Sequence, residues 1–200
     1  MTLKQIWLVL AIAVLTPAAE AVGPAAKEEE SHVRPVVARI LDNVRKLREA
    51  DPEAVPMAIW KALADAGVEN YVVSANIEAL VRNTAFTLGI PRDRIRGART
   101  ELDGGRWTTR LLQPIPHGEG KADIVRNLVR ARPHGVAIAA FGNSYATDGA
   151  FLRDVATQPS LPGGAAGTAM MINGGKPVPG LTEHFICVEQ RKTAGSARTP

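Results

Sequence analysis

The stretch that decides the fold runs from Val136 to Asp148 and reads VAIAAFGNSYATD. Residues Val136–Phe141 are apolar throughout, which is typical of a strand buried on both faces of a parallel sheet. The small and polar residues that follow are predicted to form the loop after this strand, and this loop contains Asn143 and Asp148. A short helix over 150–156 is predicted next.

Helix and strand patterns alternate on both sides of that stretch. Helices are predicted over 53–66, 77–89 and 121–130, strands over 71–73, 95–98 and 169–172, and a β-hairpin over 100–108. Gly67 is well suited to the left-handed position that ends the first helix. This alternation predicts an α/β fold, a mostly parallel sheet with helices on both faces, and ligands in such sheets bind beyond the carboxyl ends of the strands.

Residues 1–21 have the pattern of a secretory signal peptide. Lys4 precedes the apolar run Ile6–Leu15, and Ala19-Glu20-Ala21 forms a small-x-small cleavage site. The run has 10 residues, whereas a membrane-spanning helix needs roughly 20. The sequence therefore predicts an exported, periplasmic protein with no stable membrane span after cleavage. The alternative is that the same run forms a buried N-terminal strand or helix of a cytoplasmic protein.

The remaining chain divides by composition. A linker is predicted over 22–32, a helix that is the remnant of a cap over 33–52, an α/β core over 53–188 and a disordered tail over 189–200. The net charge of +4 comes from 24 basic and 20 acidic residues spread along the chain, which does not favour a nucleic-acid partner. The single cysteine, Cys187, is predicted to be a buried small hydrophobe. The four histidines, His32, His117, His134 and His184, show no metal-ligand spacing.

Three groups of polar residues follow predicted strands or begin predicted helices. Ser74 ends a strand and Asn76 is predicted to start a helix, so helix N-terminal amides would lie beside a hydroxyl and form an anion site. Lys121 follows a glycine-rich turn that could bring its ammonium to the same anion. The predicted phosphate-binding residues are Ser74, Ala75, Asn76 and Lys121.

Asn143 and Asp148 offer the oxygen ligands that Mg²⁺ prefers, so they are the predicted metal ligands. Hydroxyl, ammonium and carboxylate groups at one sheet edge suit phosphoryl transfer, in which catalysis is mainly positioning and charge neutralisation.

These motifs, taken in order, resemble a known family. The order Val72-Val73-Ser74-Ala75, then Gly120-Lys121, then Gly142-Asn143-Ser144 with Thr147-Asp148 is similar to the haloacid dehalogenase (HAD) hydrolase superfamily, most of all its phosphoserine-phosphatase-like branch. The resemblance covers about residues 53–175. It implies a HAD-like Rossmannoid sheet with a β-hairpin insertion and a reduced N-terminal helical cap. It also implies a Mg²⁺-dependent phosphomonoester hydrolase with a small phosphorylated substrate.

The resemblance assigns a role to each matched residue. Ser74 corresponds to the serine that hydrogen-bonds the transferred phosphoryl group. Lys121 corresponds to the catalytic lysine that offsets the charge of the nucleophile and phosphate. Asn143 and Asp148 correspond to the motif that holds Mg²⁺, although many relatives have Asp where this chain has Asn143.

The first motif of that family is missing from this chain. Its members carry Asp-x-Asp after an apolar strand, the first Asp being the covalent nucleophile, and no Asp-x-Asp occurs in these 200 residues. The nearest candidate, Asp42, is followed two residues later by Val44. The alternative function is a non-catalytic relative that binds phosphate or a partner. A misplaced start is a further alternative, in which an active cytoplasmic enzyme carries its Asp-x-Asp upstream of Met1.

Overall fold

The structure, a computed structural model, describes residues 11–15, 55–87, 90–132, 135–159 and 166–188. The predicted linker, cap helix and tail lie outside these residues. Of the predicted signal peptide, only 11–15 are described. Within the described parts no helix has the length and apolar character needed to cross a membrane.

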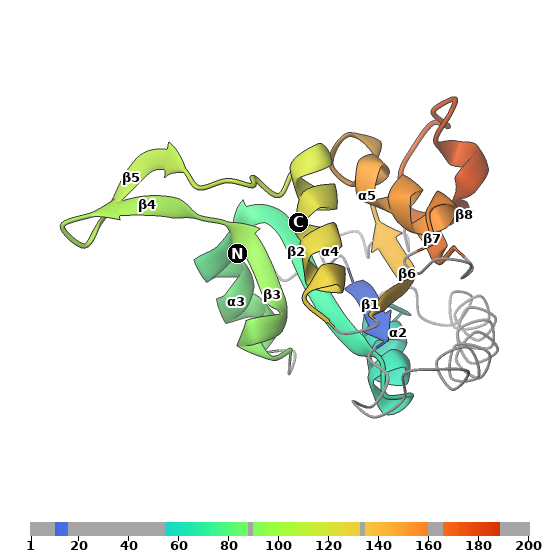
Figure 1. Ribbon diagram of the computed structural model, residues 1–200, viewed down its shortest axis with the longest axis horizontal. Helices are drawn as coiled ribbons and strands as arrows, with labels where there is room; N and C mark the ends of the chain where they lie inside the picture. The colour runs from blue at the N-terminus through green and yellow to red at the C-terminus, as the bar shows by residue number, and fades with distance from the viewer. Residues whose placement is uncertain (1–10, 16–54, 88–89, 133–134, 160–165, 189–200) are drawn as a thin grey trace, which may run out of the picture.

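The described chain folds into a six-stranded sheet, a two-stranded hairpin and four α-helices (Figure 1). Its strands are β1 (Ala11–Leu15), β2 (Glu69–Ile77), β3 (Ile95–Ala98), β4 (Thr100–Asp103), β5 (Arg106–Leu111), β6 (Val136–Gly142), β7 (Thr168–Ile172) and β8 (Ile186–Val188). Its helices are α2 (Val55–Asp65), α3 (Glu78–Thr87), α4 (Glu119–Arg130) and α5 (Tyr145–Thr157), with 3₁₀ turns at Arg92–Arg94 and Thr182–His184. The strand order in the large sheet is β3-β2-β1-β6-β7-β8.

Helices cover both faces of this sheet, as the alternating pattern predicts. On one face, Trp60 and Leu63 of α2 and Ala85 of α3 join a buried cluster with Val72 of β2 and Ile138 of β6. On the other face, the core combines Val125 of α4 and Phe151 of α5 with sheet residues that include Tyr71, Val73 and Ala140. The two clusters alternate along β2 because successive side chains of a strand point to opposite faces. The α/β fold class is therefore confirmed.

Strand β1 is the one antiparallel member of the described six-stranded sheet. It pairs antiparallel with β2 on one side and β6 on the other, with Ala11 opposite Val72 and Ile12 opposite Ala140. The other neighbouring strands are parallel. Residues 11–15 of the predicted apolar run thus form a central strand of this sheet.

The hairpin and the longest apolar strand follow their sequence patterns closely. All seven residues of β6 are buried. The β4–β5 hairpin turns at Gly104 (φ 54°) and Gly105 (φ 79°), and a tight turn with positive φ at both central residues selects glycine. Gly67, at φ 78°, ends α2 in the left-handed conformation as predicted.

Several element boundaries differ from the prediction, and two of the differences affect predicted site residues. Strand β2 continues to Ile77, so the helix predicted to start at Asn76 begins at Glu78. Helix α5 begins at Tyr145 rather than 150, because Ser144 caps it by accepting the Thr147 N–H at 3.4 Å. Both shifts change the surroundings of predicted site residues.

Candidate functional site

The carboxyl ends of β2, β3, β6 and β7 lie at one edge of the sheet. Strands β2 and β6 run in the same direction because β1 is antiparallel to both, and β3 and β7 are parallel to them. Lys121, near the start of α4, and Asp148, in the first turn of α5, meet at this edge beside the end of β6. This edge is therefore where the candidate site lies.

The Lys121 and Asp148 side chains form a buried ion pair. Lys121 Nζ lies 2.6 Å from Asp148 Oδ1, and the two side chains are only 1% and 3% exposed. The Phe151 ring packs beside the ammonium, 6.0 Å from Nζ to the ring centroid. A charge pair in such a low-dielectric place is costly to separate, so the two side chains act as one unit.

Two glycines before Lys121 explain how it reaches this position. Gly118 precedes α4 with φ 55°, and its N–H donates to the Thr147 carbonyl at 3.1 Å, which joins the start of α4 to the first turn of α5. At Gly120 an added Cβ would lie 2.0 Å from the Ile115 carbonyl oxygen. The turn therefore requires glycine at 120 for a close backbone contact, and Lys121 follows directly.

Asp148 is fixed by the backbone at the end of β6. Its Oδ2 accepts the N–H of Asn143 at 2.8 Å and that of Ser144 at 3.1 Å. Gly142 makes room for this arrangement, since a Cβ there would lie 2.6 Å from Asp148 Cβ. The prediction that Asp148 lies in a loop is wrong: it belongs to α5, which begins earlier than its sequence suggests.

Ser74 has different surroundings from those predicted. It is buried within β2, and its Oγ accepts the Asn76 N–H at 3.2 Å. Because α3 begins at Glu78, the predicted helix start beside Ser74 is wrong. Ala75 is half-buried and Asn76 is exposed. Ser74 belongs to the strand end at this edge, without helix amides of its own.

Asp148, one of the two residues predicted to hold Mg²⁺, does not fit that ion as it lies. Asp148 Oδ1 contacts an ammonium and Oδ2 accepts two amides, so both oxygens are already engaged. No group of three or more His, Cys, Asp or Glu side chains suited to a metal occurs in the part of the chain that the structure describes. A Mg²⁺ ion needs several hard oxygen ligands, and one neutralised carboxylate does not supply them.

The remaining candidates from the sequence lie elsewhere. Cys187 is exposed rather than buried, which corrects its prediction, and its Sγ lies 3.7 Å from the Tyr145 hydroxyl oxygen. It is exposed because β8 is an edge strand of the sheet. His117 and His184 belong to no metal-binding group of described residues.

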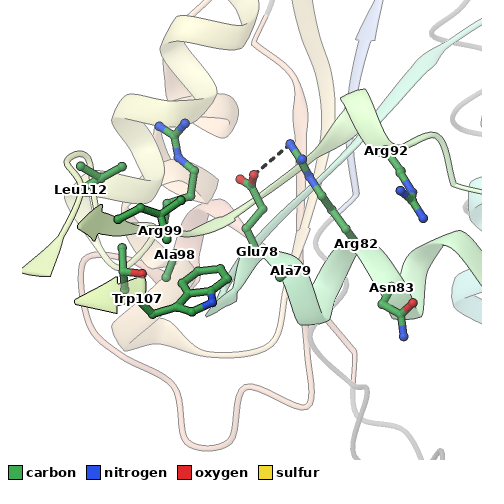
Figure 2. A pocket seen from close by; sticks show the side chains of 11 residues that line it. Glu78, Ala79, Arg82, Asn83, Arg92, Ala98, Arg99, Trp107 and Leu112 are labelled. Atoms are coloured by element: carbon green, nitrogen blue, oxygen red, sulfur yellow. Dashed lines mark ion pairs between the residues drawn. The ribbon is translucent and has the colours of Figure 1, made fainter. Parts of the chain in front are cut away.

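A pocket between α3 and the hairpin is the feature that the sequence did not indicate (Figure 2). It has a volume of about 430 Å³, and Arg82, Arg99 and Trp107 are among the residues that line it. These residues come from a helix, the end of a strand and a hairpin, so no local motif joins them. Only the tertiary arrangement brings them together.

Comparison with known proteins gives one match. The model of the haloacid dehalogenase-like hydrolase family matches residues 8–153. No curated protein and no solved structure matches the chain. The matched range includes β1 and ends within α5, so it contains Ser74, Lys121 and Asp148.

Proposed function

Because the chain belongs to the haloacid dehalogenase-like hydrolase family, we propose that it recognises the phosphoryl group of a small phosphomonoester. The proposed site is the sheet edge around Lys121 and Asp148, with Ser74 as the hydroxyl group. We place the chain in the phosphoserine-phosphatase-like branch. The basis is the sequence order of its motifs and the presence of a hairpin between β3 and α4.

The hydrogen-bonding capacity of Lys121 carries this proposal. An ammonium has three N–H donors, and Asp148 is its one acceptor among the described residues. A buried donor without an acceptor is costly. Phosphate oxygens would accept hydrogen bonds from the Lys121 N–H groups that have no acceptor within the described residues. The Thr147 Oγ1 atom, one residue before Asp148, is also buried without a partner in the described chain.

The Lys121–Asp148 pair also suits a phosphoryl group because its ammonium is fixed in position. The Asp148 carboxylate holds the ammonium in place and is itself held by two backbone amides. A preorganised cation requires little rearrangement when an anion arrives. Lys121 therefore supplies charge, Asp148 positions it, and Ser74 would donate a hydroxyl hydrogen bond.

Hydrolysis by the family's phosphoenzyme route requires a carboxylate nucleophile. The central strand β1 consists of Ala, Ile, Ala, Val and Leu and carries no such group. Asp148 is committed to Lys121 and the backbone. We therefore propose that the residues of this sheet edge bind a phosphoryl group without hydrolysing it.

Calorimetric titration with inorganic phosphate at low ionic strength tests this site. Wild-type protein is expected to bind phosphate, and Lys121→Met or Ser74→Ala to weaken binding about tenfold or more, since a charge-assisted hydrogen bond contributes that much. Lys61→Met is the matched control, because Lys61 is exposed on α2 and pairs with Asp65. Phosphate affinity unchanged in both site variants, with their folds intact by circular dichroism, would refute the assignment.

A second candidate function, Mg²⁺-dependent phosphomonoester hydrolysis, is favoured by the family match alone. Incubation of the same proteins with p-nitrophenyl phosphate, with and without Mg²⁺, distinguishes hydrolysis from binding alone. Phosphate binding without release of p-nitrophenol supports the non-catalytic function. Release that requires Mg²⁺ and is lost in Lys121→Met supports the phosphatase and contradicts our first choice.

Export to the periplasm stays a prediction from the N-terminal sequence. Cell fractionation and N-terminal sequencing test it, with a mature chain that begins at Val22 as the expected result. A chain that still begins at Met1 would contradict cleavage and favour the alternative in which the apolar run serves as a strand.

A further inference from the structure

The pocket between α3, the end of β3 and the β4–β5 hairpin shares no residue with the Lys121 site. Its volume of about 430 Å³ lies in the range of small-molecule sites. Figure 2 shows the Glu78 side chain between those of Arg82 and Arg99, with the Trp107 ring nearby. It lies at the carboxyl edge of the sheet, because Ala98 ends β3 and Glu78 follows the end of β2.

The pocket has an excess of positive charge. Arg82, Arg92 and Arg99 line it together with one acidic residue, Glu78, which gives these four side chains a formal charge of +2. Glu78 is buried and used by the fold: its Oε2 accepts the Gly97 N–H at 3.0 Å, and its Oε1 pairs with Arg82 at 2.8 Å. Arg99 is exposed and forms no ion pair with any described residue.

Two polar atoms of the lining residues have no partner. Arg82 Nε and Thr100 Oγ1 are buried, and neither makes a hydrogen bond within the described parts of the chain. Buried donors are satisfied in the great majority of cases, so two orphaned donors in one pocket are unusual. Both atoms lie inside the wall of the pocket, so the exposed Arg99 guanidinium is the group that an oxygen-rich anion would contact first.

The other wall of the pocket is apolar. Trp107 and Leu102 are 64% and 62% exposed although they are large hydrophobic residues on a projecting hairpin. An exposed indole next to cationic groups offers a flat surface for stacking. The pocket therefore combines a charge that suits a dianion with an aromatic platform.

We propose that this pocket binds a phosphate monoester of a planar aromatic group. A phosphate monoester carries a charge of about −1.5 to −2 at neutral pH, which matches the excess charge of the lining side chains. Its oxygens face Arg82 and Arg99, and its ring lies against Trp107. The site goes beyond the proposed function, because it requires neither Lys121 nor Ser74.

Phenyl phosphate is the probe, and its binding is followed by calorimetry and by tryptophan fluorescence. Phenyl phosphate is expected to bind at least about tenfold more tightly than inorganic phosphate or phenol. Of the three compounds, only phenyl phosphate contacts both the arginines and the Trp107 ring. Arg99→Gln is expected to weaken binding about tenfold through loss of a charge-assisted contact. Trp107→Phe is expected to abolish the fluorescence change, since Trp107 is the tryptophan that lines the pocket.

Two control variants separate binding in this pocket from binding elsewhere on the protein. Arg106→Gln removes an exposed arginine from the same hairpin outside the pocket lining and is expected to leave the affinity unchanged. Lys61→Met removes an exposed cation on α2, outside both sites, and is likewise expected to leave phenyl phosphate binding intact. Equal affinity in Arg99→Gln and wild type, or an unchanged fluorescence signal in Trp107→Phe, would overturn the proposal.

Discussion

Gly120 allows the close backbone contact that positions Lys121, because glycine has no side chain. Its Cα faces the Ile115 carbonyl, and an added Cβ would lie 2.0 Å from that oxygen. We expect Gly120→Ala to lower the free energy of unfolding by about 3 kcal/mol, because the backbone would have to move. Urea unfolding measures the change.

Gly149 provides the matched control for this substitution. It lies within α5, and the nearest atom to an added Cβ is the end of a flexible leucine side chain, Leu181 Cδ1, at 3.1 Å. Gly149→Ala is expected to leave stability unchanged or to raise it slightly, since alanine favours helices. Equal losses in both variants would contradict the role given to Gly120.

The Lys121–Asp148 pair leads to a second prediction. Lys121→Met leaves a buried carboxylate without its cation and is expected to destabilise the fold by about 3–5 kcal/mol. The double variant Lys121→Met with Asp148→Leu is expected to recover much of this loss, because no unpaired charge remains. Chemical denaturation measures both variants. A double variant as unstable as the single one would mean that the loss of stability comes from packing and not from the unpaired charge.

Sequence reasoning succeeded for side chains whose partners are near in sequence and failed where the partners are distant. The roles of the glycines near Lys121 and of the Gly104–Gly105 turn follow from local backbone requirements. The family order of motifs places Lys121 and Asp148 at one sheet edge, but their pairing across 27 positions was not predicted, because the sequence assigns Asp148 to a metal ion. Arg82, Arg99 and Trp107 have no such order, so their pocket was not predictable.

At the scale of elements, an ion-pair network joins the start of β2 to the end of α4. Arg132 Nε donates to Glu69 Oε2 at 2.9 Å, and the Tyr71 hydroxyl donates to the same oxygen at 2.8 Å. Burial by itself would raise the pKa of Glu69, but the hydrogen bonds from Arg132 and Tyr71 and the nearby guanidinium charges hold it below its usual 4.5. The ionised form is therefore favoured in the folded state.

This lowered pKa predicts how stability depends on pH. A carboxyl group whose pKa is lower in the folded state stabilises the protein above its unfolded pKa, and the contribution is lost as the pH falls through the folded value. Wild-type protein should lose more stability between about pH 5 and pH 3 than Glu69→Gln does. Urea midpoints at the two pH values provide the measurement, and parallel losses would contradict the assignment.

Element boundaries show why local patterns indicate the fold class but misplace two site residues. The buried run of β6 is recognisable because every residue from Val136 to Phe141 is apolar. Strand β2 extends past Ser74 into polar residues because Ile77 still pairs with Ala98 of β3 after a register shift. Helix α5 starts at Tyr145 because of the Ser144 cap, although Gly149 within it disfavours a helix.

At the scale of the whole molecule, β1 joins two groups of parallel strands. It pairs with β2 and β6, so the two halves of the sheet meet through this short segment. Removal of residues 1–21 would expose the edges of both neighbouring strands. We expect the shortened chain to be less stable by about 4 kcal/mol, since each lost backbone hydrogen bond contributes about 1 kcal/mol.

The comparison is made between the full chain and one that begins at Val22, by urea unfolding of both. A chain that begins at Val22 with an unchanged urea midpoint would mean that β1 contributes nothing to stability. Signal-peptide cleavage would remove β1 from the sheet, and an unchanged midpoint would show that the fold tolerates this loss. The alternating pattern predicts this sheet but not its antiparallel centre, because the apolar run of 10 residues, with Lys4 before it and a small-x-small site after it, favours a signal peptide over a strand.

The β4–β5 hairpin projects away from the sheet and the helices (Figure 1). Its turn residues Gly104 and Gly105 have no atom within 4 Å of where a side chain would begin. Extra residues spliced in at this tip would enter solvent rather than the core, and such tips are where inserted sequences are tolerated. The tip is therefore a natural place to attach a peptide tag or a fluorescent reporter without disturbing either site.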